Sequence, residues 1–294
     1  MRVDHLVAPV FVVLWSTGFI GAKLGLPHAE PMTFLALRFG IVAGVLFLWA
    51  GLAGSRRLTT RQWIDQLMIG FLLHFVYLGG VFVAISMGVE AGLSALIVGL
   101  QPVLTALLAR RFLSERLTRP QWVGMCLGLA GVSLVVLRKL DAGLGDWVGV
   151  AICFAGLIGI CAGSLLQKLW AGDTPMRMGN AAQFTSASLA CAAVAVWTET
   201  GAITWHPEFI FALGWLIVVL SLGAITLLYV LIQRGGASNV ASLFFLVPPC
   251  TALIAWWLFD ERLGAVEVAG VVITALGVLM VNRPTLFKAR PVPG

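Results

Sequence analysis

The feature that most constrains this chain of 294 residues is a repeat within its own sequence. A shift of 146 positions places residues 91–136 over residues 237–282 without a gap, and 15 of the 46 pairs are identical. Each copy has an apolar run with a proline near its middle, a short charged break, and a second apolar run with spaced glycines. The identical pairs include Pro102 with Pro248, Glu115-Arg116-Leu117 with Glu261-Arg262-Leu263, Gly124 with Gly270, and Gly131 with Gly277. A repeat of this kind in an apolar chain predicts that one membrane unit was duplicated.

The composition predicts a chain that is surrounded by lipid. It is 60% hydrophobic and 11% charged, with a mean hydropathy of +0.99, whereas soluble domains are about 25% charged. The excess of 19 Lys and Arg over 13 Asp and Glu fits cationic loops on one membrane face, and we expect no nucleic-acid partner. All five cysteines lie in apolar runs without metal-ligand spacing, so we expect neither a disulfide framework nor a metal site: Cys126, Cys153, Cys161, Cys191 and Cys250.

Ten apolar segments are long enough, or nearly so, to cross the hydrocarbon layer as helices. They lie at about residues 6–26, 32–52, 65–88, 91–112, 120–137, 147–168, 178–198, 209–233, 237–259 and 264–282. The first segment is longer than a signal-peptide core and has no cleavage site, so we interpret it as a helix of the mature protein. The connections are short, which predicts one integral-membrane domain with two repeats, 1–140 and 141–294.

The positive charges predict the orientation of this domain. With the N-terminus in the cytoplasm, fourteen Lys and Arg fall in cytoplasmic segments and four in external ones. Each half has five spans, so the second half enters the membrane from the opposite side. The expected fold is therefore an all-α integral membrane protein of ten transmembrane helices in two inverted five-helix repeats, with both termini cytoplasmic. Secondary transporters commonly have this plan, with a substrate site near the midplane.

The prolines of the repeat predict matched breaks in the fourth and ninth spans. Pro102 and the pair Pro248-Pro249 lie near the middle of these spans, and each removes a backbone donor, which frees a carbonyl near Val98 or Phe244. In lipid such a carbonyl must face protein or a watery cavity. Matched breaks therefore favour a central cavity; the alternative is a pair of inherited kinks with a packing role.

These motifs together identify a family. The run from Ala95 to Leu117 with Pro102, its copy from Pro248 to Gly277, the start Trp15-Ser16-Thr17-Gly18-Phe19 and the pair Leu37-Arg38 resemble the EamA-type drug/metabolite transporter superfamily. Spans six and seven match more loosely, at Gly163-Ser164 and Gln183. Members are ten-helix permeases, and many are bacterial exporters of amino acids and related metabolites. The resemblance implies a multi-pass protein of the bacterial inner membrane.

Polar and aromatic groups at mid-depth are candidates for lining the cavity. The candidate substrate-binding residues are Trp15, Ser16, Thr17, Phe19, His74, Tyr77, Gln101, Pro102, Ser164, Thr226, Tyr229, Ser242 and Pro248, with Gln167 beside Ser164. A single hydroxyl within a span more often bonds to its own backbone or to a neighbouring helix. Together these residues predict a mildly polar cavity for a small amphipathic solute.

Ionisable groups within or beside the spans have two interpretations each. His74 lies deep in a span, where it could exchange protons near neutral pH, or it could be a neutral imidazole bonded between helices. Arg38 is expected to reach an interface or pair with a helix terminus rather than touch substrate. Glu115 and Glu261 are expected to pair with adjacent arginines or to cap a following helix.

The predicted function is secondary transport by alternating access, most simply the export of amino acids or amino-acid-like solutes. Alternatives are another cargo, such as a sugar, nucleotide-sugar or drug, and a membrane receptor or structural subunit without transport. We expect no enzyme activity, cofactor or metal, because no phosphate-binding loop, nucleophile elbow or dinucleotide motif is present. The expected partners are a small-molecule substrate, the lipid bilayer and a proton as coupling ion; the oligomeric state is left open.

Overall fold

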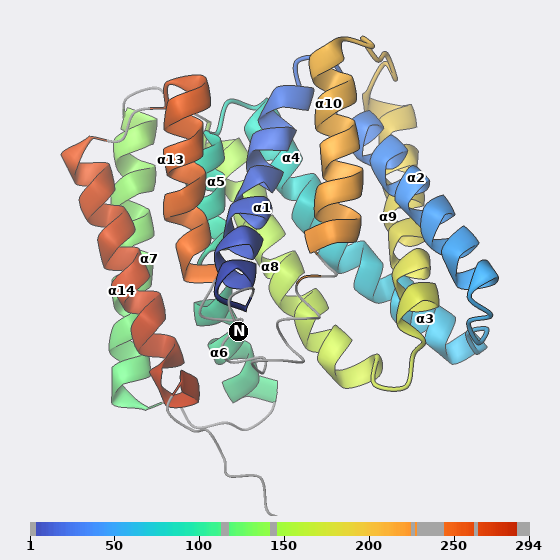
Figure 1. Cartoon of the computed structure of the whole chain (residues 1–294). Helices are drawn as coiled ribbons and strands as arrows, with labels where there is room; N and C mark the ends of the chain where they lie inside the picture. The colour runs from blue at the N-terminus through green and yellow to red at the C-terminus, as the bar shows by residue number, and fades with distance from the viewer. Residues whose placement is uncertain are drawn as a thin grey trace, which may run out of the picture. The chain divides into compact units, whose positions relative to one another are not determined.

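The computed structural model of the chain is helical throughout its regular elements (Figure 1). It describes residues 4–112, 118–141, 146–224, 227, 244–261 and 264–286. Among these residues the one β-type contact is an isolated bridge between Ala29 and Ile203. The prediction of an all-α protein is confirmed.

The helices follow the apolar segments of the sequence closely. They are α1 (Asp4–Gly25), α2 (Pro31–Leu52), α3 (Thr60–Gly70), the π-helix η1 (Phe71–Gly79), α4 (Gly80–Ser86), α5 (Ala91–Val98), α6 (Gln101–Phe112), α7 (Arg119–Asp141), α8 (Trp147–Trp170), α9 (Met176–Thr198), α10 (Pro207–Trp215), the π-helix η2 (Leu216–Ala224), the 3₁₀-helix η3 (Phe244–Leu246), α13 (Val247–Phe259) and α14 (Ala265–Leu286). Local signals set several starts: Pro31 and Pro207 occupy first turns, and Thr59 forms a capping box with Gln62.

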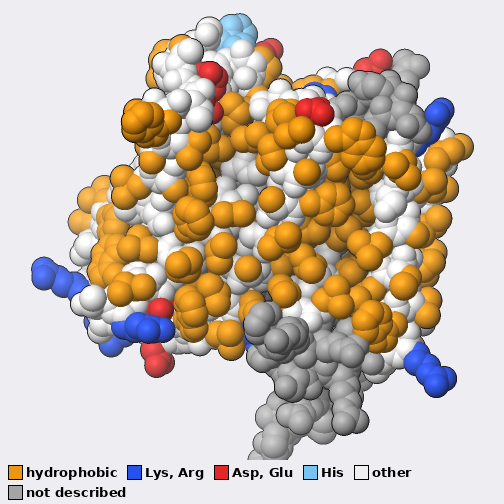
Figure 2. Space-filling model, turned by 180° about the vertical axis from the view of Figure 1, so that it is seen from behind, with side chains coloured by type: hydrophobic (Ala, Val, Ile, Leu, Met, Phe, Trp, Pro, Cys, Tyr) orange, Lys and Arg blue, Asp and Glu red, His pale blue; other side chains and the backbone are white. Residues whose placement is uncertain are grey.

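The described surface is that of a protein embedded in lipid. Six helices are long and apolar enough to cross a membrane, and four shorter apolar helices accompany them. Large apolar side chains point outward, for example Trp197 at 88% and Trp257 at 78% exposure. Figure 2 shows apolar side chains over most of the face in view, with charged groups near its upper and lower edges. The chain is a multi-pass membrane protein.

The chain forms two compact units, and each draws on both halves of the sequence. The first unit comprises Met1–Thr17, Glu90–Leu144 and Ala224–Gly294, and the second comprises Gly18–Val89 and Gly145–Gly223. Two pairs of helices that match at the repeat offset each fall within one unit. Shifted by 146 positions, the bounds of α7 become 265–287, close to those of α14, and the bounds of α2 become 177–198, close to those of α9.

In the first unit, α7 and α14 pack antiparallel through glycines that match in the repeat. A Cβ on Gly131 would lie 2.6 Å from the carbonyl oxygen of Gly270, and a Cβ on Gly277 would lie 2.9 Å from the Cα of Gly128. Higher numbers in α7 therefore meet lower numbers in α14. Small residues let the two backbones approach closely, as in other membrane helix pairs.

In the second unit, α2 and α9 also run antiparallel. The carboxylate of Glu199, just after α9, accepts hydrogen bonds of 2.7 Å from the backbone amides of Met32 and Thr33 at the start of α2. Further along, the Ser188 hydroxyl donates to the Ala36 carbonyl at 2.9 Å. Glu199 thus satisfies amides that the first turn of α2 leaves open, and its charge complements the positive end of the helix dipole.

The fourth span is broken where the sequence predicts a break. α5 ends at Val98, and α6 begins at Gln101 with Pro102 in its first turn. In the ninth span Pro248 and Pro249 lie in the first turn of α13, directly after the 3₁₀-helix η3, and the residues before Phe244 lie outside the described part of the chain. A Cβ on Gly99 would lie 2.8 Å from the Cγ of Pro248, so the two proline segments are adjacent in the first unit.

Glu261 caps a helix of the other repeat. Its carboxylate oxygens accept hydrogen bonds from the amides of Ala91 (3.1 Å) and Gly92 (3.2 Å), the first two residues of α5. The sequence predicted pairing with the adjacent arginines or capping of the following helix, whereas the helix that Glu261 caps precedes it in the chain. Glu115, its counterpart in the first repeat, lies outside the described residues.

The glycine contact predicts a stability difference between two Gly→Ala variants. Gly277→Ala should lower the free energy of unfolding by about 1–3 kcal/mol, because the new methyl group meets the backbone of α7. Gly44→Ala in α2 is the matched control, since a Cβ there meets nothing within 4 Å. Thermal unfolding in detergent measures both; a Gly277→Ala protein as stable as the control would contradict the packing argument.

Candidate functional site

The candidate cavity residues divide between the two compact units. Trp15, Ser16, Thr17, Gln101, Pro102 and Pro248 belong to the first unit, and Phe19, His74, Tyr77 and Ser164 to the second. Thr226, Tyr229 and Ser242 lie outside the described residues. The second unit also contains polar side chains that were expected to be structural or were not singled out, and these form the more concentrated cluster.

In the first unit, the polar groups of the candidates serve helix packing. The Ser16 hydroxyl donates to the Val12 carbonyl at 2.8 Å and lies 3.3 Å from the Val247 carbonyl, which ties α1 to the start of α13. The Trp15 ring lies edge-on to Phe244, with ring centroids 5.1 Å apart. The Thr17 hydroxyl donates to the Leu14 carbonyl at 2.6 Å, the back-bonding common for hydroxyls in membrane helices.

In the second unit, three glutamines from three helices form a buried amide cluster. Gln183 of α9 donates through Nε2 to Oε1 of Gln66 in α3 (2.6 Å) and to Oε1 of Gln167 in α8 (2.8 Å). Gln66 is 1% exposed, and its own Nε2 has no hydrogen-bond partner. A buried amide donor without a partner costs free energy, so it is a group that a ligand could satisfy.

Arg38 of α2 is buried in the same unit, at 5% exposure. Its Nη2 donates to the Ser221 hydroxyl at 3.2 Å, and its Nε has no partner. Among the residues that the structure describes, no carboxylate pairs with this guanidinium. The expectation that Arg38 reaches an interface is therefore wrong, because the head group lies inside the helix bundle with one neutral partner.

Aromatic rings lie around the cation. The His74 ring stacks on Phe184, with centroids 4.2 Å apart and planes 14° apart, and lies 5.7 Å from Phe39. The guanidinium carbon of Arg38 lies 5.5 Å from the Phe39 ring centroid, within the range of cation–π attraction. The side chains of His74 and Tyr77 lie near the Arg38 guanidinium. We call Arg38, His74, Tyr77, Gln66, Gln183 and Ser221 the buried polar cluster.

Two π-helices supply half of this cluster. His74 and Tyr77 lie on η1, and Ser221 lies on η2, which is found near the matching position of the second repeat. π-helical turns are rare and occur frequently at functional sites, because the wider turn displaces side chains from the α-helical register. Glycines of α8 fit against the wide turn: a Cβ on Gly159 would lie 2.7 Å from Val76 Cγ1, and one on Gly156 would lie 3.0 Å from the Tyr77 carbonyl oxygen.

The sequence contained a signal for part of this cluster. Arg38, Gln66 and Gln183 each interrupt an apolar helix with a charged or amide side chain, and such groups in membrane helices commonly face the bundle interior and mark functional positions. The α-helical register, however, does not show that Arg38, His74 and Gln183 lie in one cluster. Ser221 had no sequence signal of its own, and neither did the π-helical turns.

The fold and this cluster define a class of protein. A helical bundle in lipid that buries a cation with no charged partner among its described residues, beside amide donors and aromatic rings, has the chemistry of a small-solute transporter. The sequence profile described as "EamA-like transporter family" matches residues 5–137 and again residues 147–283. The chain therefore belongs to the EamA-like transporter family, a family of membrane transporters.

Named relatives and a solved structure agree with this class. The chain is 27% identical over 285 residues to an uncharacterized inner membrane transporter, YedA, of Escherichia coli (strain K12), covering 95% of this chain and 91% of that protein. It is 26% identical over 292 residues to a probable amino-acid metabolite efflux pump of the same strain, covering 94% and 93%. A solved structure described as "Crystal structure of protein" has the same fold, with a TM-score of 0.67 at 19% identity over 97% of this chain and 98% of that chain.

The amide cluster predicts how stability changes in two variants. This change distinguishes a packing role of the glutamines from a role in solute binding. Gln183→Met should destabilise the protein by about 2–4 kcal/mol, because two buried carbonyl oxygens lose their donor. The triple variant Gln66→Met, Gln167→Met, Gln183→Met removes all three polar groups and should recover most of this stability. Thermal unfolding and transport are measured on both variants. A stable triple variant with full transport would restrict the amides to packing.

Proposed function

We propose that this protein is a secondary transporter that exports amino acids or amino-acid-like solutes by alternating access, and that Arg38 binds the solute carboxylate. The observation that carries the proposal is the buried guanidinium of Arg38, whose Nε lacks a partner and whose Nη2 has a neutral one. His74, Tyr77, Gln66, Gln183 and Ser221 would form the rest of the binding region.

The energetics of a buried cation support a ligand with a negative charge. A charged side chain inside a membrane bundle is costly unless it is paired, and the described residues offer Arg38 no carboxylate. A solute carboxylate would supply the missing charge and can bond to the guanidinium in a bidentate manner. Without a bound anion, the buried guanidinium keeps its unfavourable free energy of desolvation. A carboxylate that binds there therefore gains more free energy than the same contact would give in water.

The surroundings of Arg38 support an amphipathic solute. Phe39, Phe184 and the His74 ring provide apolar faces, and the Gln66 amide keeps a donor free. A molecule with a carboxylate and an apolar or mixed side chain would use both features. The relative described as a probable amino-acid metabolite efflux pump supports the same cargo class.

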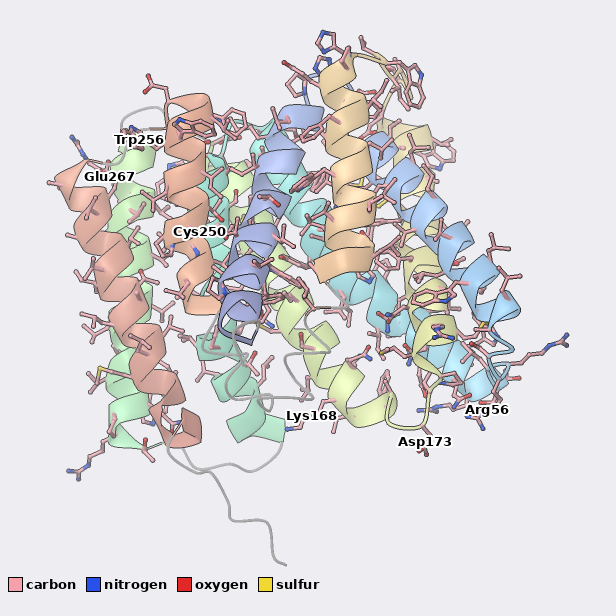
Figure 3. The ribbon with its side chains drawn as sticks, viewed as in Figure 1. Arg56, Lys168, Asp173, Cys250, Trp256 and Glu267 are labelled. Carbon is pink, nitrogen blue, oxygen red and sulfur yellow. The ribbon has the colours of Figure 1, made fainter. Side chains whose placement is uncertain are left out.

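We propose the architecture that alternating access requires: ten membrane spans, two inverted five-helix repeats in residues 1–140 and 141–294, and both termini in the cytoplasm. The antiparallel packing of the matched pairs α7–α14 and α2–α9 supports the inversion. The basic loops of the second unit support the orientation. Arg56 donates to the Asp173 carbonyl at 3.0 Å, and Figure 3 shows Arg56, Lys168 and Asp173 near the lower ends of the helices.

Arg38→Gln tests the carboxylate anchor. In proteoliposomes loaded with amino acids, the variant should lose transport by about ten-fold or more, because a charge-assisted hydrogen bond contributes roughly 1.5–3 kcal/mol. Arg38→Lys should restore only part of the rate, since an ammonium cannot form the bidentate pair. Ser188→Ala is the matched control, because it removes a hydroxyl bond between α9 and α2 outside the buried polar cluster and keeps the cation.

Competition by paired solutes separates a carboxylate contact from a structural role. Phenylalanine should compete with wild-type transport far better than phenethylamine, which lacks the carboxylate, and Arg38→Gln should lose this preference. Equal competition by the two solutes in the wild type would contradict the proposed role of Arg38. Absence of any substrate-dependent flux from a panel of amino acids would contradict the proposed cargo class itself.

His74→Phe tests whether a proton is coupled to transport. The substitution keeps an aromatic ring for stacking on Phe184 and removes both titratable nitrogens. If His74 exchanges the coupling proton, the variant stays folded while the pH dependence of transport becomes flat. A variant with the wild-type pH profile would assign His74 to aromatic packing, and proton coupling would then have to involve another group.

A further inference from the structure

Two histidines and a glutamate converge at one end of the second unit, away from the membrane-spanning residues of the buried polar cluster. His28 lies between α1 and α2, His206 is the N-cap of α10, and Glu208 lies in its first turn. The Nε2 of His28 is 3.3 Å from Oε2 of Glu208, and the Nδ1 of His206 is 3.9 Å from the same oxygen. The two imidazole rings are stacked, with centroids 4.7 Å apart and planes 12° apart.

One of these distances already matches a transition-metal site, and the others are close to it. One ligand atom from each of the three residues lies within 4.8 Å of the other two. Tetrahedral Zn²⁺ with bonds of about 2.0–2.1 Å holds its ligand atoms about 3.3 Å apart. The His28–Glu208 pair already has that separation. His206 and Glu208 are about half exposed or more, so small rotations of their side chains can close the remaining gaps.

The backbone holds the two loops in place before any ion binds. Ala29 and Ile203 form an antiparallel bridge, and the amide of Thr204 donates to the His28 carbonyl at 2.8 Å. On the flank, the Glu30 carboxylate accepts 2.7 Å hydrogen bonds from the amide and hydroxyl of Thr200. The loops therefore position their ligands at little further entropic cost.

The donor set selects a class of ion. Two imidazoles and one carboxylate suit Zn²⁺ and its neighbours Ni²⁺ and Cu²⁺, whereas Mg²⁺ and Ca²⁺ prefer a shell of oxygen ligands. Three protein ligands leave a fourth position for water, as in open zinc sites. Figure 2 shows histidine side chains beside acidic ones at the upper edge of the surface, so an ion in solution can reach them.

We propose that His28, His206 and Glu208 bind a divalent transition-metal ion of the Zn²⁺ class, and that the bound ion clamps the α1–α2 loop to the start of α10. The ion joins His28 to Glu208, which lies 180 positions later in the chain. It replaces the hydrogen bond between His28 and Glu208, and the 3.4 Å bond from the Glu208 amide to Nδ1 of His206, by three metal–ligand bonds. The clamp is separate from the solute site and does not rest on the proposed transport function.

The experiment uses the full-length chain in detergent, purified with an affinity tag that contains no histidine. Zn²⁺ is titrated by calorimetry, and Co²⁺ serves as a spectroscopic probe because its visible bands report nitrogen and oxygen ligands in a tetrahedral site. The wild type should bind a single ion per chain and melt at a higher temperature with Zn²⁺ than with Mg²⁺. Binding should weaken as the pH falls, since protons compete for the imidazole nitrogens.

Three variants test the assignment of ligands. Glu208→Gln and the double variant His28→Gln, His206→Gln should each weaken Zn²⁺ binding by about ten-fold or more and lose the tetrahedral Co²⁺ bands. His5→Gln is the matched control, because it removes a histidine outside the cluster and should bind like the wild type. Glu208→Gln is the mildest change and keeps the protein testable if the double variant does not fold.

Two results would overturn the proposal. One is a wild type without saturable Zn²⁺ binding, and the other is a set of cluster variants that keep wild-type affinity, which would place any bound ion elsewhere. A Glu208→Gln protein that melts lower by the same amount with and without Zn²⁺ would show that the cluster serves only as a hydrogen bond between loops, and this too would refute the metal clamp.

Discussion

Helix association in this protein takes place without a hydrophobic driving force between helices, because lipid tails are as apolar as the side chains that face them. Close contact and buried hydrogen bonds must supply the affinity instead. Gly131 and Gly277 allow α7 and α14 to touch along their backbones, and the glycines of α8 admit η1 in the same way. Carboxylates at the helix ends complete this arrangement: Glu199 binds the start of α2, and Glu261 binds the start of α5.

The same constraint makes an unsatisfied polar group informative. Lipid offers no water to an exposed donor, so a donor inside the bundle without a partner is a cost that the fold carries for a reason. Arg38 and Gln66 both hold such donors within the second unit. They lie beside two π-helices, whose irregular turns are themselves less stable than an α-helix. Strain and unmet polarity in one region are what a solute-binding region is expected to show.

The sequence allowed more of the fold to be predicted than of the candidate site. Apolar length alone located the spans, because a helix must satisfy its own backbone in lipid, and Pro102 correctly marked the break between α5 and α6. The site depends on the directions in which side chains point around each helix axis. A uniform register of 3.6 residues per turn does not give these directions once η1 widens to π-helical turns. For Arg38, snorkelling was the expectation from its position near a span end; packing against Phe39 and Ser221 decided otherwise. His28 lies 180 positions before Glu208 in the chain, so contacts between their loops, such as the Ala29–Ile203 bridge, bring them together.

The antiparallel pairing of α2 with α9 has a consequence for the origin of specificity. At the repeat offset, Arg38 corresponds to Phe184, and His74 corresponds to Leu220. The two copies of the repeat therefore differ at this pair of positions: one has the cation, and the other has the ring that stacks on His74. A scaffold of two similar repeats can thereby form an asymmetric binding region for a solute with two chemically different ends.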